Sequence, residues 1–166
     1  MRQLRFKPMG VIHTAFDRAT GTPIQPSRPG GARATVEVYP EYVDGLKDLD
    51  GFERIWLIYW FDRAPGSRLR VVPFLDNRER GIFATRAPTR PCPIGMSAVR
   101  LLAISGNHLH VEDADILDGT PLLDIKPYVP EFDAYAVQRS GWFERAGARK
   151  FADERFSSRE PKRRML

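Results

Sequence analysis

The chain has 166 residues, one cysteine and a formal net charge of +5, with a pI near 9.7. This length suits one domain with a sizeable core, and the positive charge permits binding to a polyanion without demanding it. No apolar run approaches the ~20 residues of a membrane helix, and the first ten residues lack the apolar segment of a signal peptide. The lone Cys92 excludes an internal disulfide, and with three scattered histidines it shows no zinc-ligand spacing. We therefore expect a cytoplasmic protein that uses no metal and no membrane.

The first third of the chain predicts two strands, a loop and a short helix. Residues 9–15 (MGVIHTA) and 34–38 (ATVEV) are short runs rich in β-branched residues, which favour strands. Between them, three prolines and three glycines in residues 21–31 indicate an irregular loop. In this loop Arg28 stands beside glycine backbone that a ligand can approach closely. Residues 41–49 (EYVDGLKDL) space their apolar side chains for one face of a short helix.

Residues 54–61 (RIWLIYWF) form the most apolar stretch and are rich in strand formers, so they predict a buried central strand. Trp56 and Trp60 could be stacking platforms for a base, but large aromatic residues more often belong to the core, and we expect them there. Asp62 follows this strand directly. A carboxylate at a strand end beside an apolar core is a candidate site residue.

The rest of the chain predicts four further strands. Residues 69–74 favour a strand, and the proline within this run confines it to a sheet edge. Gly106-Asn107 marks the turn of a hairpin, whose strands are residues 97–105 and 108–111. Residues 121–126 (PLLDIK) are another short strand, after a strong turn signal at Asp118-Gly119.

The predicted elements favour a mainly β fold. About seven strands without a βαβ rhythm indicate a single-domain antiparallel β-barrel with short helical additions. We expect this barrel domain to occupy residues 1–135. Composition changes after Pro130, and residues 142–156 predict a C-terminal helix, so residues 136–166 are expected to form a helical extension with a basic tail.

Two dense motifs, FATRAPTRPCPIG (residues 83–95) and DADILDGTPLLDIKPY (residues 113–128), bracket the hairpin. Prolines prevent residues 86–95 from forming a helix or a central strand, and irregular polar segments beside strands are where sites are often built. Four carboxylates and two arginines in these motifs suit a zwitterionic or cationic small molecule. The same motifs could simply be rigid loops that close a barrel. No serine nucleophile motif is present, and a glycosidase carboxylate pair has no sequence support.

These motifs, together with GVIHT, RPGG and IWLIYWF, resemble the TrmO (YaeB-like, TsaA-like) family in one order from Gly10 to Asp133. The resemblance implies an S-adenosylmethionine-dependent methyltransferase built on a β-barrel. It implies methylation of N6 of threonylcarbamoyladenosine in tRNA, next to the anticodon. It also implies a homodimer with the cofactor near the subunit interface.

The resemblance also places the site residues. Cofactor contacts are expected at Arg28, Pro29, Gly30, Phe61, Asp62, Arg86, Leu117, Asp118, Gly119 and Thr120. Arg86 suits the cofactor carboxylate through a charge-assisted hydrogen bond. A base that removes the acceptor proton would help, and Asp124, Asp62 and Tyr128 remain open for this role. Lys126 is a candidate contact for a phosphate or for the substrate carboxylate.

The chain departs from the family pattern at three points. Cys92 stands where the family has an asparagine, Asp62 stands where many bacterial members have a histidine, and the chain ends without their separate C-terminal domain. These departures keep alternatives open. The protein could methylate another acceptor, or it could sense S-adenosylmethionine without turnover. A plain RNA-binding barrel would also fit the positive charge.

Overall fold

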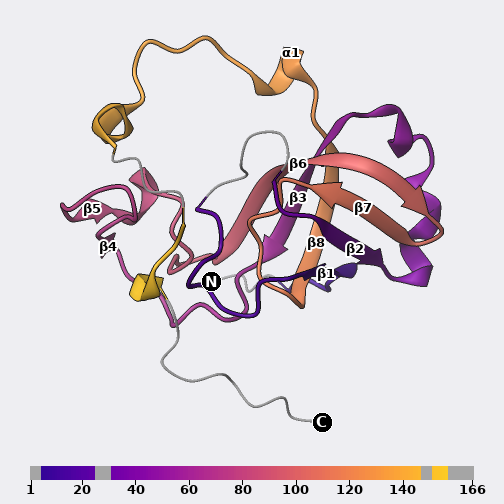
Figure 1. The fold of residues 1–166 in the computed structure, drawn as a ribbon, viewed down its shortest axis with the longest axis horizontal. Coiled ribbons are helices and arrows are strands. Elements are labelled where there is room, and N and C mark those ends of the chain that lie inside the picture. Colours follow the sequence, from indigo (N-terminus) through magenta and orange to yellow (C-terminus); the bar gives the residue numbers. More distant parts are fainter. Residues whose placement is uncertain (1–4, 25–30, 147–150, 157–166) are drawn as a thin grey trace.

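The computed structural model describes residues 5–24, 31–146 and 151–156, and its main body is a closed barrel of antiparallel strands (Figure 1). The barrel strands follow one another in the order β1-β2-β7-β6-β3-β8, and β8 pairs with β1 to close it. Their bounds are β1 Gly10–Thr14, β2 Ala34–Val38, β3 Arg54–Trp60, β6 Ile94–Ser105, β7 His108–Glu112 and β8 Thr120–Pro127. The mainly β fold and its antiparallel barrel are therefore confirmed.

The barrel interior follows from the two-residue period of its strands. In β3, Ile55, Leu57 and Tyr59 point inward and are at most 4% exposed, whereas the alternate residues point outward. The same alternation fills the interior with Ile12, Val36, Val38, Val99, Leu109, Val111 and Leu122, all fully buried. Trp56 and Trp60 lie on the outward side, and Trp60 is 44% exposed, so the expectation that they belong to the core is wrong.

A second, smaller apolar cluster lies beside the barrel. It contains the two-stranded sheet of β4 (Arg70–Val71) and β5 (Arg80–Gly81), followed by the 3-10 helix η3 (Ile82–Ala84). Val71, Ile82 and Ala87 are buried there with Phe156, so the C-terminal segment completes this cluster. Figure 1 shows the cluster next to the end of the barrel where β3 stops and β6 begins.

The strand predictions are confirmed with shifted ends. β6 begins at Ile94 and lies between β7 and β3, so the expectation that residues 86–95 form no central strand is wrong for Ile94 and Gly95. The strand expected at residues 69–74 shortens to β4, because the backbone leaves the sheet before Pro73. The helix expected at residues 41–49 is instead two 3-10 helices, η1 (Pro40–Leu46) and η2 (Leu49–Gly51). Asp48, at φ 64°, separates them, because a left-handed residue cannot continue a right-handed helix.

The predicted C-terminal helix is wrong over the described residues. Residues 141–145 form the 3-10 helix η4 (Gly141–Arg145), Phe151 makes a strand-like bridge to Pro23, and η5 spans only Glu154–Phe156. Before them, α1 (Pro130–Asp133) is a single turn, and the chain then crosses to the small cluster as an exposed arm (Figure 1). The apolar residues of this region lack a helical period, so no amphipathic face stabilises a long helix.

Candidate functional site

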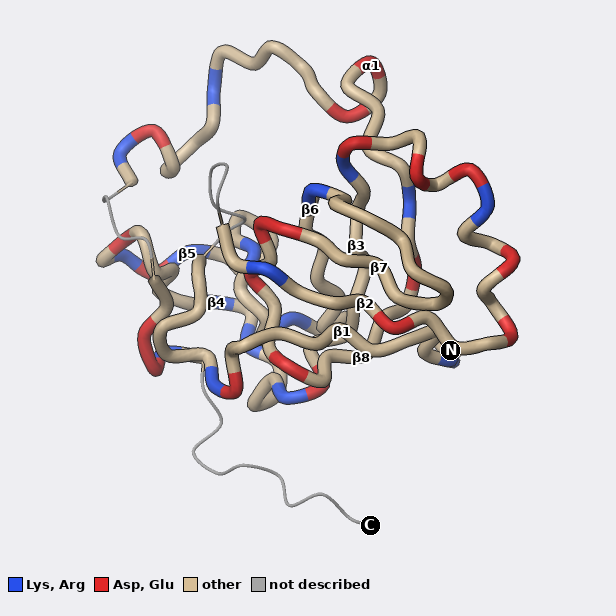
Figure 2. Tube along the Cα trace, turned by 45° about the vertical axis from the view of Figure 1, so that its right-hand side comes forward, with Lys and Arg blue, Asp and Glu red and all other residues tan. Residues whose placement is uncertain are grey.

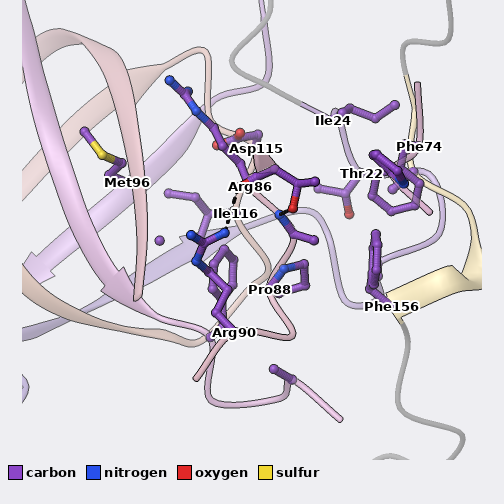
Figure 3. A pocket seen from close by; sticks show the side chains of 18 of the residues that line it. Thr22, Ile24, Phe74, Arg86, Pro88, Arg90, Met96, Asp115, Ile116 and Phe156 are labelled. Carbon is purple, nitrogen blue, oxygen red and sulfur yellow. Dashed lines mark hydrogen bonds between the residues drawn. The ribbon is translucent and has the colours of Figure 1, made fainter. Parts of the chain in front are cut away.

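A cavity of about 820 Å³ lies between the barrel end and the small cluster. Segments that are far apart in the sequence line it. The barrel side supplies the end of β3 through Ala64, the start of β6, and Asp115 to Leu117 with Thr120. The other side supplies Thr22 to Ile24, Pro73 to Leu75, the loop around Arg86, and residues of the C-terminal segment. Figure 3 shows Met96 on the barrel side and Phe74 and Phe156 on the side of the small cluster. A volume of this size suits a cofactor or a small substrate.

The loop before β8 is fixed from behind by backbone hydrogen bonds. Asp118 N donates to Phe16 O at 2.7 Å, and Gly119 N donates to Ile12 O at 2.8 Å. Gly119 has φ 72°, a conformation that favours glycine, so the DGT sequence builds a tight turn here. Arg63 Nη2 donates to the Asp118 carbonyl at 2.6 Å and links this turn to the end of β3.

The FATR loop is held by its own polar side chains. Arg90 Nη1 donates to the carbonyls of Ile82 and Thr85, at 3.2 and 2.7 Å, and Thr85 Oγ1 donates to Ile82 O at 2.9 Å. Trp142 Nε1 donates to the next exposed carbonyl, Ala84 O, at 2.7 Å. The prolines remove competing donors, so side chains satisfy these carbonyls and fix the loop at the cavity edge.

Asp115 is the most perturbed acid of the cavity wall. Ser97 Oγ donates to its Oδ1 at 2.5 Å, and the Tyr59 hydroxyl lies 3.0 Å from the same Ser97 Oγ. Burial raises the pKa of Asp115 to about 6, although the Ser97 hydrogen bond and the charge of Arg86 favour its ionised form. Burial also raises the pKa of Tyr59, which therefore stays a neutral phenol. Figure 3 shows Arg86 beside Asp115.

The cavity residues fit the chemistry of S-adenosylmethionine. Phe61, Ile116 and Leu117 supply apolar walls for an adenine, Arg86 supplies a cation for a carboxylate, and carboxylates face a ligand that is itself a cation. On the same wall, the Arg63 side-chain Nε lies 3.6 Å from Asp62 Oδ1, which ties these two cavity residues together.

The structure brings together half of the expected cofactor residues. Phe61, Asp62, Arg86, Leu117 and Thr120 all line this cavity. Asp118 and Gly119 lie in the turn behind its wall and do not line it. Arg28, Pro29 and Gly30 lie outside the described residues. Their roles toward the cofactor stay predictions.

The expected catalytic residues lie elsewhere on the barrel. Asp124 and Lys126 pair with each other at 2.8 Å and stand opposite Ile58 and Trp56 of β3, on the outward face. The Tyr128 ring lies 5.6 Å from that of Trp56. None of the three lines the cavity, and their catalytic roles stay predictions.

Several site residues escaped the sequence reasoning. In the sequence, Tyr59 and Ser97 look like ordinary inward-facing residues of two strands. They meet only because the β3–β6 register pairs Leu57 with Ser97. Asp115 was recognised only as one carboxylate of a cluster. Its flanking residues Ala114 and Ile116, both buried, are the signal that could have singled it out.

Two kinds of feature are absent from the described part of the chain. No group of three or more histidine, cysteine, aspartate or glutamate side chains there is arranged to hold a metal ion. No helix in that part is long and apolar enough to cross a membrane. Cys92 is exposed and does not line the cavity.

Comparison with known proteins gives one consistent result. Residues 11–134 match the family model of the tRNA-methyltransferase O N-terminal domain. The chain is 52% identical over 140 residues to a probable S-adenosyl-L-methionine-binding protein of Pyrococcus abyssi, covering 84% of this chain and 76% of that protein. It is 31% identical over 137 residues to the tRNA (adenine(37)-N6)-methyltransferase of Mus musculus, covering 77% of this chain but 31% of that protein.

Solved structures give the same fold. The crystal structure of TrmO from Pseudomonas aeruginosa matches with a TM-score of 0.71 and 37% identity, over 84% of this chain. The chain spans 62% of that solved chain, which is therefore considerably longer than the region matched here.

Proposed function

This chain belongs to the tRNA-methyltransferase O family, and on that premise we propose that it methylates N6 of threonylcarbamoyladenosine in tRNA with S-adenosylmethionine as the methyl donor. The observation that carries the proposal is the single cavity in which Phe61, Arg86, Asp115 and Leu117 meet from distant parts of the sequence. It offers apolar walls, a cation and a perturbed carboxyl group within one site.

The cofactor would supply an activated methyl group on a sulfonium, so the protein mainly has to align donor and acceptor and exclude water. We assign Arg86 to the cofactor carboxylate and Asp62 to its amino group. Phe61 and Leu117 pack against the adenine. The fixed turn at Gly119 and the bonds around Thr85 keep these groups in place before the ligand arrives, which lowers the entropy cost of binding.

The acceptor nitrogen must lose a proton as it gains the methyl group. We assign this proton to Asp115, because it lines the cavity and its pKa of about 6 leaves it mostly ionised, yet moderately basic, near pH 7. Ser97 orients the carboxylate through its 2.5 Å hydrogen bond, and Tyr59 orients Ser97. Asp62 lines the same cavity and would serve as the base only if another group bound the cofactor amino group.

A methylation assay tests the proposal. Purified tRNA that carries threonylcarbamoyladenosine without the extra methyl is incubated with the protein and S-adenosylmethionine, then digested to nucleosides for mass spectrometry. We expect one added methyl on the modified nucleoside, and none on tRNA that lacks the threonylcarbamoyl group. Methylation of both RNAs, or of neither, would contradict the proposal.

A non-catalytic role is the second candidate, because several relatives carry the name of S-adenosyl-L-methionine-binding proteins. Tight cofactor binding in calorimetry without turnover on any tRNA would favour this sensor. Turnover on a different acceptor would instead favour a methyltransferase of changed specificity. The assay above and a cofactor titration together separate the three outcomes.

We also propose that the protein is a homodimer that buries the outer face of β3 and β6. Trp60 and Ile94 stand opposite each other on this face and are 44% and 39% exposed, with Met96 next to them at 49%. A contiguous exposed apolar surface of this kind marks a contact site. Ile94 and Met96 also line the cavity, so the second copy would lie close to the cofactor.

A further inference from the structure

One aromatic side chain at the cavity edge is left open to solvent although its backbone is firmly held. Phe83, in η3, is 77% exposed and lines the cavity. The carbonyls on both sides of it, those of Ile82 and Ala84, accept hydrogen bonds from the side chains of Thr85, Arg90 and Trp142. Because its backbone is held in place, the exposed Phe83 ring is preorganised to contact a ligand.

Cations and further aromatic rings surround Phe83. The Arg90 guanidinium lies 6.0 Å from the Phe83 ring centroid, and that of Arg80 lies 6.0 Å from the Trp142 ring. Phe143, which is 53% exposed, packs edge-on against Trp142. Together Phe83, Arg90, Trp142 and Phe143 form what we call the aromatic rim, and all four line the same cavity.

The sequence segment that carries Phe83 and Arg90 is rich in positive charge. Residues 63–90 contain seven arginines, no lysine and two acidic residues, a net charge of 7 − 2 = +5, which equals that of all 166 residues. Figure 2 shows blue segments gathered around β4 and β5. Arg90 is held by carbonyl oxygens, and the described residues place no carboxylate within ion-pair distance of it, so its charge is not neutralised locally.

From these observations we infer that the aromatic rim is a stacking site for an unpaired RNA base, with the arginines of residues 63–90 other than Arg63 and Arg86 paired to the flanking phosphates. Aromatic rings stack on bases of any sequence, and adjacent cations follow the phosphate backbone. The inference rests on the proposed function, because the acceptor RNA supplies the base. It identifies the ligand as a nucleotide next to the one that enters the cavity. The positive charge favours RNA over a protein partner with an apolar surface.

Substitution of Phe83 tests the stacking site. Phe83→Leu keeps an apolar side chain of similar length but loses the flat ring, and Phe83→Trp keeps a stacking surface. Phe132→Leu is the matched control, because Phe132 is 72% exposed on α1 and does not line the cavity. The probe is a synthetic anticodon stem-loop RNA with an unmodified adenosine 3′ to the anticodon, and its affinity is measured by fluorescence anisotropy at fixed salt.

We expect Phe83→Leu to weaken RNA binding roughly 5- to 150-fold, the usual effect of losing one base–aromatic stack. Phe83→Trp and Phe132→Leu should bind like the wild type, and S-adenosylmethionine affinity, measured by calorimetry, should not change in any variant. Thermal unfolding is expected to be unchanged, since the side chain of Phe83 is largely in solvent.

Other results would overturn the inference. RNA affinity that is equal in Phe83→Leu and wild type, or absent in both, would remove the stacking site. A loss of S-adenosylmethionine affinity would make Phe83 a cofactor residue, and a drop in molecular mass in light scattering would make it a subunit contact. Because this probe lacks the threonylcarbamoyl group, a stacking effect can be found even if the methylation assay fails. Methylation can likewise succeed without any effect of Phe83.

Discussion

At the scale of single residues, Asp115 links the stability of the protein to its chemistry. The native pKa of about 6 lies above the unfolded value near 3.8, so between these values the native state binds more protons than the unfolded state. The free energy of unfolding therefore falls as pH rises from about 4 to about 6. Above about pH 6, Asp115 is ionised in a buried site that disfavours the charge. Groups held in such unfavourable states are common at functional sites.

Asp115→Asn is expected to raise the free energy of unfolding above pH 6 by up to about 3 kcal/mol relative to the wild type, and to leave it unchanged near pH 4. The amide oxygen can still accept from Ser97, so the hydrogen bond is kept. Urea unfolding at the two pH values measures the difference, with the exposed Asp17→Asn as a control for loss of one charge. An equal effect of Asp115→Asn at both pH values would contradict the expectation. The same variant should lose methyl transfer while it still binds S-adenosylmethionine.

Arg86→Ala is expected to weaken S-adenosylmethionine binding roughly 10- to 100-fold, because a hydrogen bond between charged groups is lost. Arg68→Ala removes an equal charge from an exposed position outside the cavity and should have little effect. Calorimetric titration of the two variants measures both affinities at one salt concentration. Equal affinities would show that the carboxylate is bound elsewhere.

At the scale of elements, what could be predicted from the sequence was local. The β-branched runs, the Gly106-Asn107 turn and the prolines of the FATR motif fix their own backbone, and the structure has strands, hairpin and loop at those places. Side-chain partners depend on register instead. No pattern within β3 or β6 alone shows that Tyr59 reaches Ser97, or that Ser97 reaches Asp115.

The failed helix predictions have a similar cause. Apolar spacing in residues 41–49 suggested a helix, but Asp48 takes a positive φ angle that interrupts it. Ser140 and Glu144 suggested the start of a second helix at residue 142, but Ala146 takes an extended conformation that ends η4. Packing of Phe156 into the small cluster then decides the path of the C-terminal segment. Tertiary contacts of this kind outweigh weak helix propensity.

The close contact between β1 and β2 at Gly10 allows a test of how tightly these two strands pack. A Cβ on Gly10 would overlap the backbone carbonyl of Glu37, which cannot move without breaking the β1–β2 ladder. Gly10→Ala is therefore expected to lower the free energy of unfolding by roughly 2 kcal/mol or more. Gly45→Ala is the control, since a Cβ there meets nothing, and it should be neutral or slightly stabilising. Thermal and urea unfolding compare the two variants. Equal stability would show that the β1 and β2 backbones can move apart to accommodate the added Cβ.

At the scale of the whole molecule, the barrel supports the candidate site, which lies at one of its ends. Its interior is filled by aliphatic side chains, and the cavity is made outside it by loops and by the small cluster. Along the described chain, Trp60 and Met96 stay exposed on the outer face of β3 and β6, which is the face that we propose for the homodimer.

Trp60→Glu tests the proposed homodimer. Trp60 is 44% exposed on the outer face of β3 and does not line the cavity, so a charge there opposes burial in an interface and leaves the cofactor site intact. We expect wild-type protein at twice the mass of the chain in light scattering and Trp60→Glu at the mass of a single chain. Leu102→Glu, 43% exposed on the far part of β6, should remain a dimer. A monomeric wild type would refute the dimer outright, whereas loss of the dimer in both variants would place the interface over a wider part of β6.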